Sequence, residues 1–163
     1  MDKHIISLLV ENSAGVLSRI AGLFSRRGYN IDSLSVGETE TPGISRMTIG
    51  VTGDAQMLEQ IKKQLNKLIN TIKVVDIAYD SAVLRELVLV KVKMTHDTRS
   101  TIIDVANLFG AKVIAVEPET ITLEMTGNQF HVQDFIQLMA AYDIIELIRS
   151  GVTGIDRKQS LSV

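Results

Sequence analysis

A polar corner near the N-terminus carries the residues best suited to bind a small molecule. An apolar run over residues 4–10 stops at Asn12-Ser13-Ala14-Gly15, and a helical pattern begins immediately afterwards. The first N–H groups of a helix have no partner within the helix and lie at the positive end of its dipole, so this corner can hold an anion. Asn30, just past the same helix, offers a side-chain carbonyl that can accept from an ammonium group. Together the two features suit a free amino acid.

The same corner has a simpler interpretation as an ordinary helix start. Ser13 or Asn12 can cap the first turn, because serine and asparagine are favoured there. Gly15 would then only allow the chain to turn tightly. Local chemistry favours this capping interpretation, since caps of this kind open most helices. Both interpretations predict a strand, a sharp turn and a helix that ends at Gly28 through a left-handed residue.

The first half of the chain predicts the elements that would position this corner. Apolar residues recur every three or four positions and predict one buried helical stripe, which consists of Val16, Ile20, Leu23 and Phe24. Alternating and β-branched runs predict strands over residues 4–10, 30–36, 44–52 and 72–77. Asp54 is expected to cap a second helix. The predicted order is therefore β-α-β-β-α-β.

The second half of the chain repeats this order. Strands are predicted over residues 84–92, 112–116, 121–125 and 144–150, and helices over residues 97–109 and 132–141. Two such units in succession predict an α+β fold of two tandem ferredoxin-like domains, residues 1–79 and residues 80–163. Each sheet should be antiparallel, with both helices on one face.

The two predicted units differ at the corner that could bind a ligand. The corresponding corner of the second unit, residues 94–98, lacks a glycine at the helix start. A close approach of ligand to backbone is therefore expected only in the first unit. Units of this size have modest cores and exposed sheet edges, which predicts a homodimer.

Composition excludes several classes of function. The chain has 163 residues, of which 45% are hydrophobic and 22% charged, and its net charge is −2. It contains no cysteine, and aromatic residues make up 4%. These values predict a cytoplasmic globular protein without disulfides, without general attraction for nucleic acid, and without a membrane-spanning run.

The residues that usually carry catalysis do not form a recognisable arrangement. His4, His96 and His131 lack metal-ligand spacing, and phosphate-loop and dinucleotide-binding motifs are absent. The acidic pairs Glu38/Glu40 and Glu117/Glu119 flank the two turn prolines, where charged residues are usually just solvated. RNA-recognition domains share the predicted strand and helix order, but Arg27-Gly28-Tyr29 is not followed by the aromatic residues of their signature. We therefore expect no catalytic residue, no metal site and no cofactor of its own.

The sequence resembles the small regulatory subunits of acetohydroxyacid synthase (acetolactate synthase). The most specific part of the resemblance is Asn12-Ser13-Ala14-Gly15-Val16-Leu17 within residues 6–19, followed by residues 22–34. Further similar stretches are residues 45–49, 59–68, 85–91 and 149–154, so the resemblance covers nearly the whole chain. It implies that the first unit is an ACT domain, which dimerises and binds valine at the dimer interface.

The resemblance also implies a role without catalysis. Subunits of this family stimulate a separate catalytic subunit, which uses thiamine diphosphate, Mg²⁺ and FAD, and make it sensitive to feedback by valine. Carried onto this sequence, the implied ligand-binding residues are Asn12, Ser13, Ala14, Gly15, Val16 and Leu17, with Asn30 and Ile31 completing the pocket across the dimer. Leucine and isoleucine each have one methylene more than valine, a small difference for a pocket to detect, so all three remain candidate effectors.

The physical properties of these residues agree with the implied roles. Backbone amides of residues 15–17 would hold the carboxylate, and Asn30 would accept from the ammonium group. Side chains of Val16, Leu17 and Ile31 would surround an isopropyl group. The alternative is a free-standing ACT-type amino-acid sensor without an enzyme partner, which co-purification with a thiamine-diphosphate enzyme would exclude.

Overall fold

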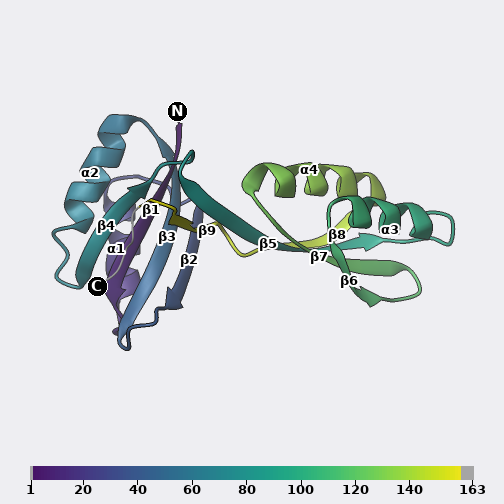
Figure 1. The fold of residues 1–163 in the computed structure, drawn as a ribbon, viewed down its shortest axis with the longest axis horizontal. Helices are drawn as coiled ribbons and strands as arrows, with labels where there is room; N and C mark the ends of the chain where they lie inside the picture. Colours follow the sequence, from purple (N-terminus) through teal and green to yellow (C-terminus); the bar gives the residue numbers. More distant parts are fainter. Residues whose placement is uncertain (1, 159–163) are drawn as a thin grey trace. The chain divides into compact units, whose positions relative to one another are not determined.

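The computed structural model describes residues 2–158 and divides them into two compact units. The first unit contains residues 2–83 together with residues 151–158, and the second contains residues 84–150. Figure 1 colours the chain from purple through teal and green to yellow. None of the helices in the described part of the chain is long and apolar enough to cross a membrane.

The first unit has the predicted βαββαβ order. Its elements are β1 (Asp2–Glu11), α1 (Val16–Arg26), β2 (Ser33–Glu38), β3 (Ile44–Gly53), α2 (Ala55–Leu65) and β4 (Thr71–Ile77). The four strands form one antiparallel sheet in the order β2-β3-β1-β4. Strands β2 and β4 are therefore its two edges.

The core of the first unit lies between this sheet and its two helices. Alternate residues Ile6, Leu8 and Val10 of the inner strand β1 face the helices. The predicted stripe of α1 is fully buried, which confirms the helical periodicity read from the sequence. Helix α2 contributes Leu58, Ile61 and Leu65, and Asp54 caps it by accepting a hydrogen bond from the N–H of Met57 at 2.7 Å, as predicted.

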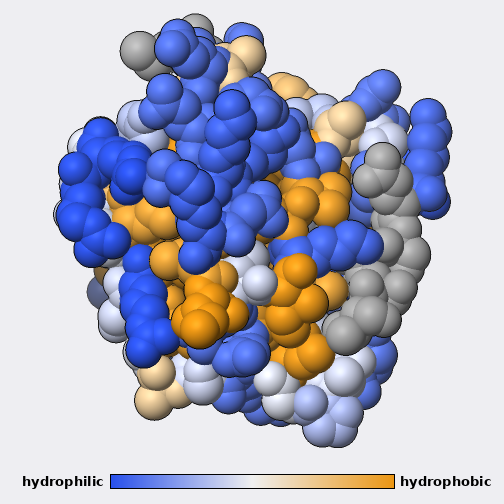
Figure 2. Space-filling model, turned by 90° about the vertical axis from the view of Figure 1, so that its left-hand side faces the viewer, coloured by the Kyte–Doolittle hydropathy of each residue, from blue (hydrophilic) through white to orange (hydrophobic). Residues whose placement is uncertain are grey.

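Several large apolar side chains of the first unit remain exposed. They are Leu17, Val36, Ile69, Ile72, Tyr79 and Ile155, of which Ile69 is 89% exposed. Figure 2 shows hydrophobic residues gathered in patches between hydrophilic ones on the face that it draws. Single exposed apolar residues are ordinary, so only those beside a cavity or a free strand edge need a further explanation.

The second unit repeats the order of the first. Its elements are β5 (Ala82–Lys93), α3 (Arg99–Leu108), β6 (Lys112–Val116), β7 (Thr120–Gly127), α4 (Gln129–Met139), a 3₁₀ turn (Ala140–Tyr142) and β8 (Ile144–Arg149). The strand order β6-β7-β5-β8 corresponds to that of the first sheet. Both α1 and α3 are followed by a left-handed glycine, Gly28 and Gly110, which confirms the exit predicted at Gly28. The tandem ferredoxin-like fold is confirmed.

The end of the described chain differs from the predicted domain division. Residues 151–158, which include β9 (Thr153–Asp156), belong to the first unit rather than the second. Val152 is 1% exposed, and its carbonyl accepts a hydrogen bond from the Ser35 hydroxyl at 3.0 Å. The Ser81 hydroxyl similarly donates to Asp156 at 2.8 Å. These contacts hold the segment to the first unit and place the first boundary after residue 83 instead of residue 79.

An ion pair joins two strands of the second unit. Both carboxylate oxygens of Glu86 accept from Arg149, at 2.9 Å from Nε and 2.7 Å from Nη2. Glu86 is only 2% exposed, whereas the Arg149 side chain is 41% exposed. The hydrogen bonds with Glu86 raise the pKa of Arg149 above its ordinary value, so the guanidinium stays charged.

Removing one member of this pair is expected to destabilise the second unit. Arg149→Met leaves the buried Glu86 carboxylate without its partner and should lower the free energy of unfolding by about 2 kcal/mol, less than for a fully buried pair because Arg149 is half exposed. The matched control is Lys93→Met, which removes an ion pair with Asp143 whose side chains are 65% and 75% exposed and should cost less than about 1 kcal/mol. Urea unfolding followed by circular dichroism measures both. Equal losses of unfolding free energy in the two variants would contradict the conclusion that Arg149 compensates a buried carboxylate.

Candidate functional site

The corner between β1 and α1 is fixed by the turn that joins β2 to β3. The backbone N–H of Asn12 donates to the carbonyl of Gly43 at 2.7 Å, and its side-chain amide donates to Glu38 at 2.6 Å. The Asn12 side chain is therefore occupied, and neither it nor Ser13 caps α1. The prediction of a side-chain cap was wrong, because the residue at the cap position is Gly15.

Gly15 gives the start of α1 an open approach. Its φ of +85° is in the left-handed region, and a Cβ there would meet no atom within 4 Å. The N–H of Val16 donates to the Ser13 carbonyl at 3.4 Å. Within residues 2–158, the N–H groups of Gly15, Leu17 and Ser18 have no such acceptor. These amides can therefore receive an anion, while the amide of Val16 is already used by the turn.

The side chains of this corner divide between core and solvent. Val16 is 4% exposed and packs in the core of the first unit, whereas Leu17 is 46% exposed. The polar residues Asn12 and Ser13, together with Ala14, are exposed. Leu17 is thus the apolar side chain of this corner that can contact a ligand.

Asn30 and Ile31 lie beyond the opposite end of α1. This helix has 11 residues, so its ends are roughly 16 Å apart. The Asn30 amide donates to Asp32 at 2.8 Å, and Asp32 accepts from the Thr52 hydroxyl at 2.7 Å. Ile31 packs partly buried against the core. Within one chain, the structure does not bring these two residues to the corner.

Two residues that support the corner were not predicted from the sequence. Glu38 was interpreted as a solvated turn residue, yet it binds the side chain of Asn12. Gly43 accepts from the backbone of the same residue. Both lie about 30 positions along the chain from the corner, and no local pattern indicates such a contact. Among the described residues, no group of three His, Cys, Asp or Glu could hold a metal ion.

Comparisons with known proteins match both halves of the chain. Residues 6–73 match the family model of the ACT domain found in small subunits of acetohydroxyacid synthase, so the chain is an ACT-domain protein. Residues 85–158 match the family model described as the small subunit of acetolactate synthase. The chain belongs to the family of acetolactate synthase small subunits, which are regulatory subunits.

Individual relatives agree along almost the full length. The probable acetolactate synthase small subunit of Methanothermobacter thermautotrophicus is 50% identical over 157 residues, which cover 96% of this chain and 94% of the relative. The acetolactate synthase small subunit of Mycolicibacterium smegmatis is 49% identical over 154 residues, covering 94% and 91%. The crystal structure of the acetolactate synthase small subunit from Thermotoga maritima superposes with a TM-score of 0.89 at 40% identity, covering 96% and 98%.

Proposed function

We propose that this small subunit binds valine between the ACT domains of a homodimer, activates its catalytic subunit and makes that subunit sensitive to valine. The observation that carries the proposal is the uncapped start of α1, where backbone amides beside Gly15 are open to an anion. The thiamine diphosphate, Mg²⁺ and FAD belong to the catalytic subunit in this proposal. This chain contributes the effector site and the contact with its partner.

The topology of the first sheet supports a site shared by two protomers. Strand β2 is an edge strand of the first sheet, and Asn30 and Ile31 lie two to three residues before its first residue, Ser33. Its last residue, Glu38, is bonded to Asn12. Antiparallel pairing of two β2 strands about a twofold axis places the start of one strand beside the end of the other. Such pairing would bring Asn30 of one protomer to the partner's Asn12 and would cover a sheet edge.

The chemistry of the two halves is complementary to an amino acid. The amides of Gly15 and Leu17 would receive the carboxylate, and the Asn30 carbonyl of the other protomer would accept from the ammonium group. The exposed Leu17 and the partly buried Ile31 offer apolar contact for a branched side chain. One methylene is worth only about 1–3 kcal/mol in such a pocket. We therefore propose valine as the main effector, with leucine or isoleucine binding more weakly.

Regulation follows from a ligand that touches both protomers. A ligand shifts an equilibrium only by its difference in affinity for the two states. Valine bound across the β2 edges would stabilise one arrangement of the dimer. In this proposal that arrangement holds the catalytic subunit in a less active state.

The decisive experiment mixes the purified chain with a cognate catalytic subunit and follows acetolactate formation with and without valine. Stimulation that valine reverses is the expected result. Stimulation without sensitivity to valine would retain the partner and refute the effector site. No stimulation would favour the free-standing sensor.

A further inference from the structure

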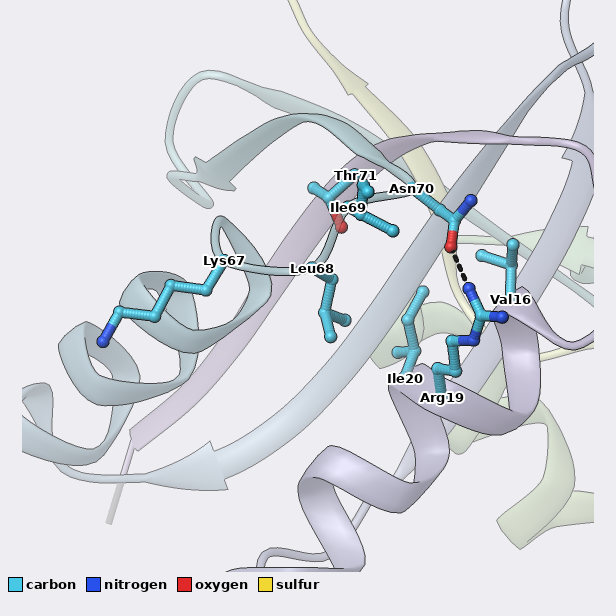
Figure 3. A pocket seen from close by; sticks show the side chains of 8 residues that line it. All are labelled: Val16, Arg19, Ile20, Lys67, Leu68, Ile69, Asn70 and Thr71. Carbon is cyan, nitrogen blue, oxygen red and sulfur yellow. Dashed lines mark hydrogen bonds between the residues drawn. The ribbon is translucent and has the colours of Figure 1, made fainter.

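The cavity of the first unit adjoins the corner that the proposed valine site uses. Figure 3 shows it between α1 and the loop from α2 to β4, and Val16, the first residue of α1, lines it. Arg19, which also lines it, donates to the side-chain carbonyl of Asn70. The cavity therefore belongs to the region already described. The apolar edge of the second sheet, in contrast, takes no part in that site.

Strand β6 leaves one edge of the second sheet unpaired within the described residues. Its neighbour in the sheet is β7, and Figure 1 shows it at the outer edge of the second unit. All of its residues are exposed, and its apolar side chains Val113, Ile114 and Val116 are 41%, 54% and 44% exposed. A strand edge with exposed β-branched side chains is a template for pairing with another strand.

A bulge sets which backbone groups of β6 point away from β7. The Glu117 N–H donates to the Thr120 carbonyl at 2.9 Å. Because these groups alternate in direction along a strand, the N–H and C=O groups of Val116 point outward. The register with β7 then skips Ile114, which is the extra residue of the bulge. The extra residue shifts the alternation by one position, so the backbone groups of Val113 point outward as well.

The same bulge places Val113 and Val116 on one face of the sheet. Each of them lies opposite a buried core residue of β7, so both are on the face that the helices cover. Lys112 and Glu117 are the next residues beyond these valines. They lie on the open face, because successive side chains of a strand point to opposite faces.

Two copies of β6 fit together when they run antiparallel about a twofold axis between residues 114 and 115. Val113 of one strand then lies opposite Val116 of the partner subunit, and the same pair recurs on the other side of the axis. The outward N–H and C=O groups of each pair can exchange two hydrogen bonds. The two valines of a pair share one face of the sheet and can cover each other. The backbone and apolar pattern of β6 is thus self-complementary.

The charges at the ends of the strand are self-complementary in the same register. Lys112 of one copy lies opposite Glu117 of the partner subunit, so one contact contains two ion pairs. Both side chains are exposed. Within residues 2–158 neither of them forms an ion pair, although Lys112 lies opposite Glu124 of β7. Lysines and bulges commonly blunt strand edges, whereas a second copy of β6 matches both the lysine and the bulge.

We propose that β6 pairs antiparallel with β6 of a second copy of this chain, with Lys112 of each strand bound to Glu117 of the other. The contact covers the exposed apolar edge of the second unit. It depends neither on the valine site nor on the β2 pairing in the first unit. Each of the three is tested by its own variants.

Engineered cysteines report this pairing directly, because the chain contains no cysteine of its own. Full chains carrying Val113→Cys and Val116→Cys are co-expressed with different affinity tags and treated with a mild oxidant. The two cysteines lie opposite each other at a Cα spacing of about 5.5 Å, which a disulfide spans. A covalent mixed dimer on a non-reducing gel is the expected result. Val113→Cys alone should give little, since the two copies of residue 113 are roughly 10 Å apart along the strands.

The control for random collision is Leu108→Cys on α3, whose side chain is 82% exposed. Co-expressed with Val116→Cys, it should give no mixed dimer. A mixed dimer formed equally well by Leu108→Cys, or none formed by the pair at positions 113 and 116, would overturn the proposal.

Charge reversal tests the register of the contact. Lys112→Glu, placed in both cysteine variants, turns two ion pairs into two repulsions and should slow disulfide formation by about tenfold. Adding Glu117→Lys to the same chains restores opposite charges and should restore the rate. Glu119→Lys makes the same change of charge two residues beyond the pair and should change the rate less than about twofold. A rate that Lys112→Glu leaves unchanged, or that the double reversal fails to restore, would contradict the pairing of Lys112 with Glu117.

Discussion

Replacing Gly15 by aspartate is expected to abolish inhibition by valine while stimulation of the catalytic subunit remains. An aspartate at this position would extend a carboxylate into the open space at the start of α1 and repel the carboxylate of valine. The left-handed backbone would cost roughly a further 1–2 kcal/mol for a residue with a Cβ. Acetolactate formation by the reconstituted enzyme, measured over a range of valine concentrations, gives the result.

The control for this variant is Gly110→Asp in the second unit. Gly110 has a φ of +67° and open space around its missing Cβ, so the strain and the added charge match those at Gly15. This control should retain full inhibition by valine. If both variants lost inhibition, backbone strain rather than loss of the site would explain the effect. If Gly15→Asp retained inhibition, the corner would not be the effector site.

Two valine-insensitive variants are expected to restore a valine site when they share one dimer. Gly15→Asp damages the amide half of the site, and Asn30→Ala damages the half that accepts from the ammonium group. Each homodimer should be insensitive to valine. A mixed dimer contains one site with both halves intact, because the two halves come from different protomers. Partial inhibition by valine should therefore return.

Co-expression of the two variants with different affinity tags allows the mixed dimer to be isolated. A dimer of wild-type chains carrying the same tags is the control for full inhibition. A site formed within one chain would give no restoration, since neither protomer would then contain both intact halves. The roughly 16 Å length of α1, which separates Asn30 from the corner, predicts restoration.

The periodicity of the sequence was sufficient to predict the two units and their order. The stripe of α1 and the cap at Asp54 are local features, so they could be read from neighbouring residues. The return of residues 151–158 to the first unit could not, because it rests on one buried valine and on contacts with distant positions such as Ser35 and Ser81. Such contacts depend on tertiary packing and leave no local pattern.

The candidate site was predictable to a similar degree. The polar corner and its glycine indicated where backbone amides would be open, and the structure places Gly15 and Leu17 there. The sequence could not indicate that Asn12 would bind Glu38 instead of capping the helix. It also could not distinguish Val16, whose side chain is in the core, from its exposed neighbour Leu17.

The return of residues 151–158 to the first unit makes the second unit an inserted domain in the order of the chain. An ACT domain obtained by ending the chain after residue 83 would lack β9 and the buried Val152. To remove the second unit cleanly, residues 84–150 must be excised and the two ends joined by a short linker. A premature stop near residue 150 would therefore damage the first unit, although most of that unit is encoded at the opposite end of the gene.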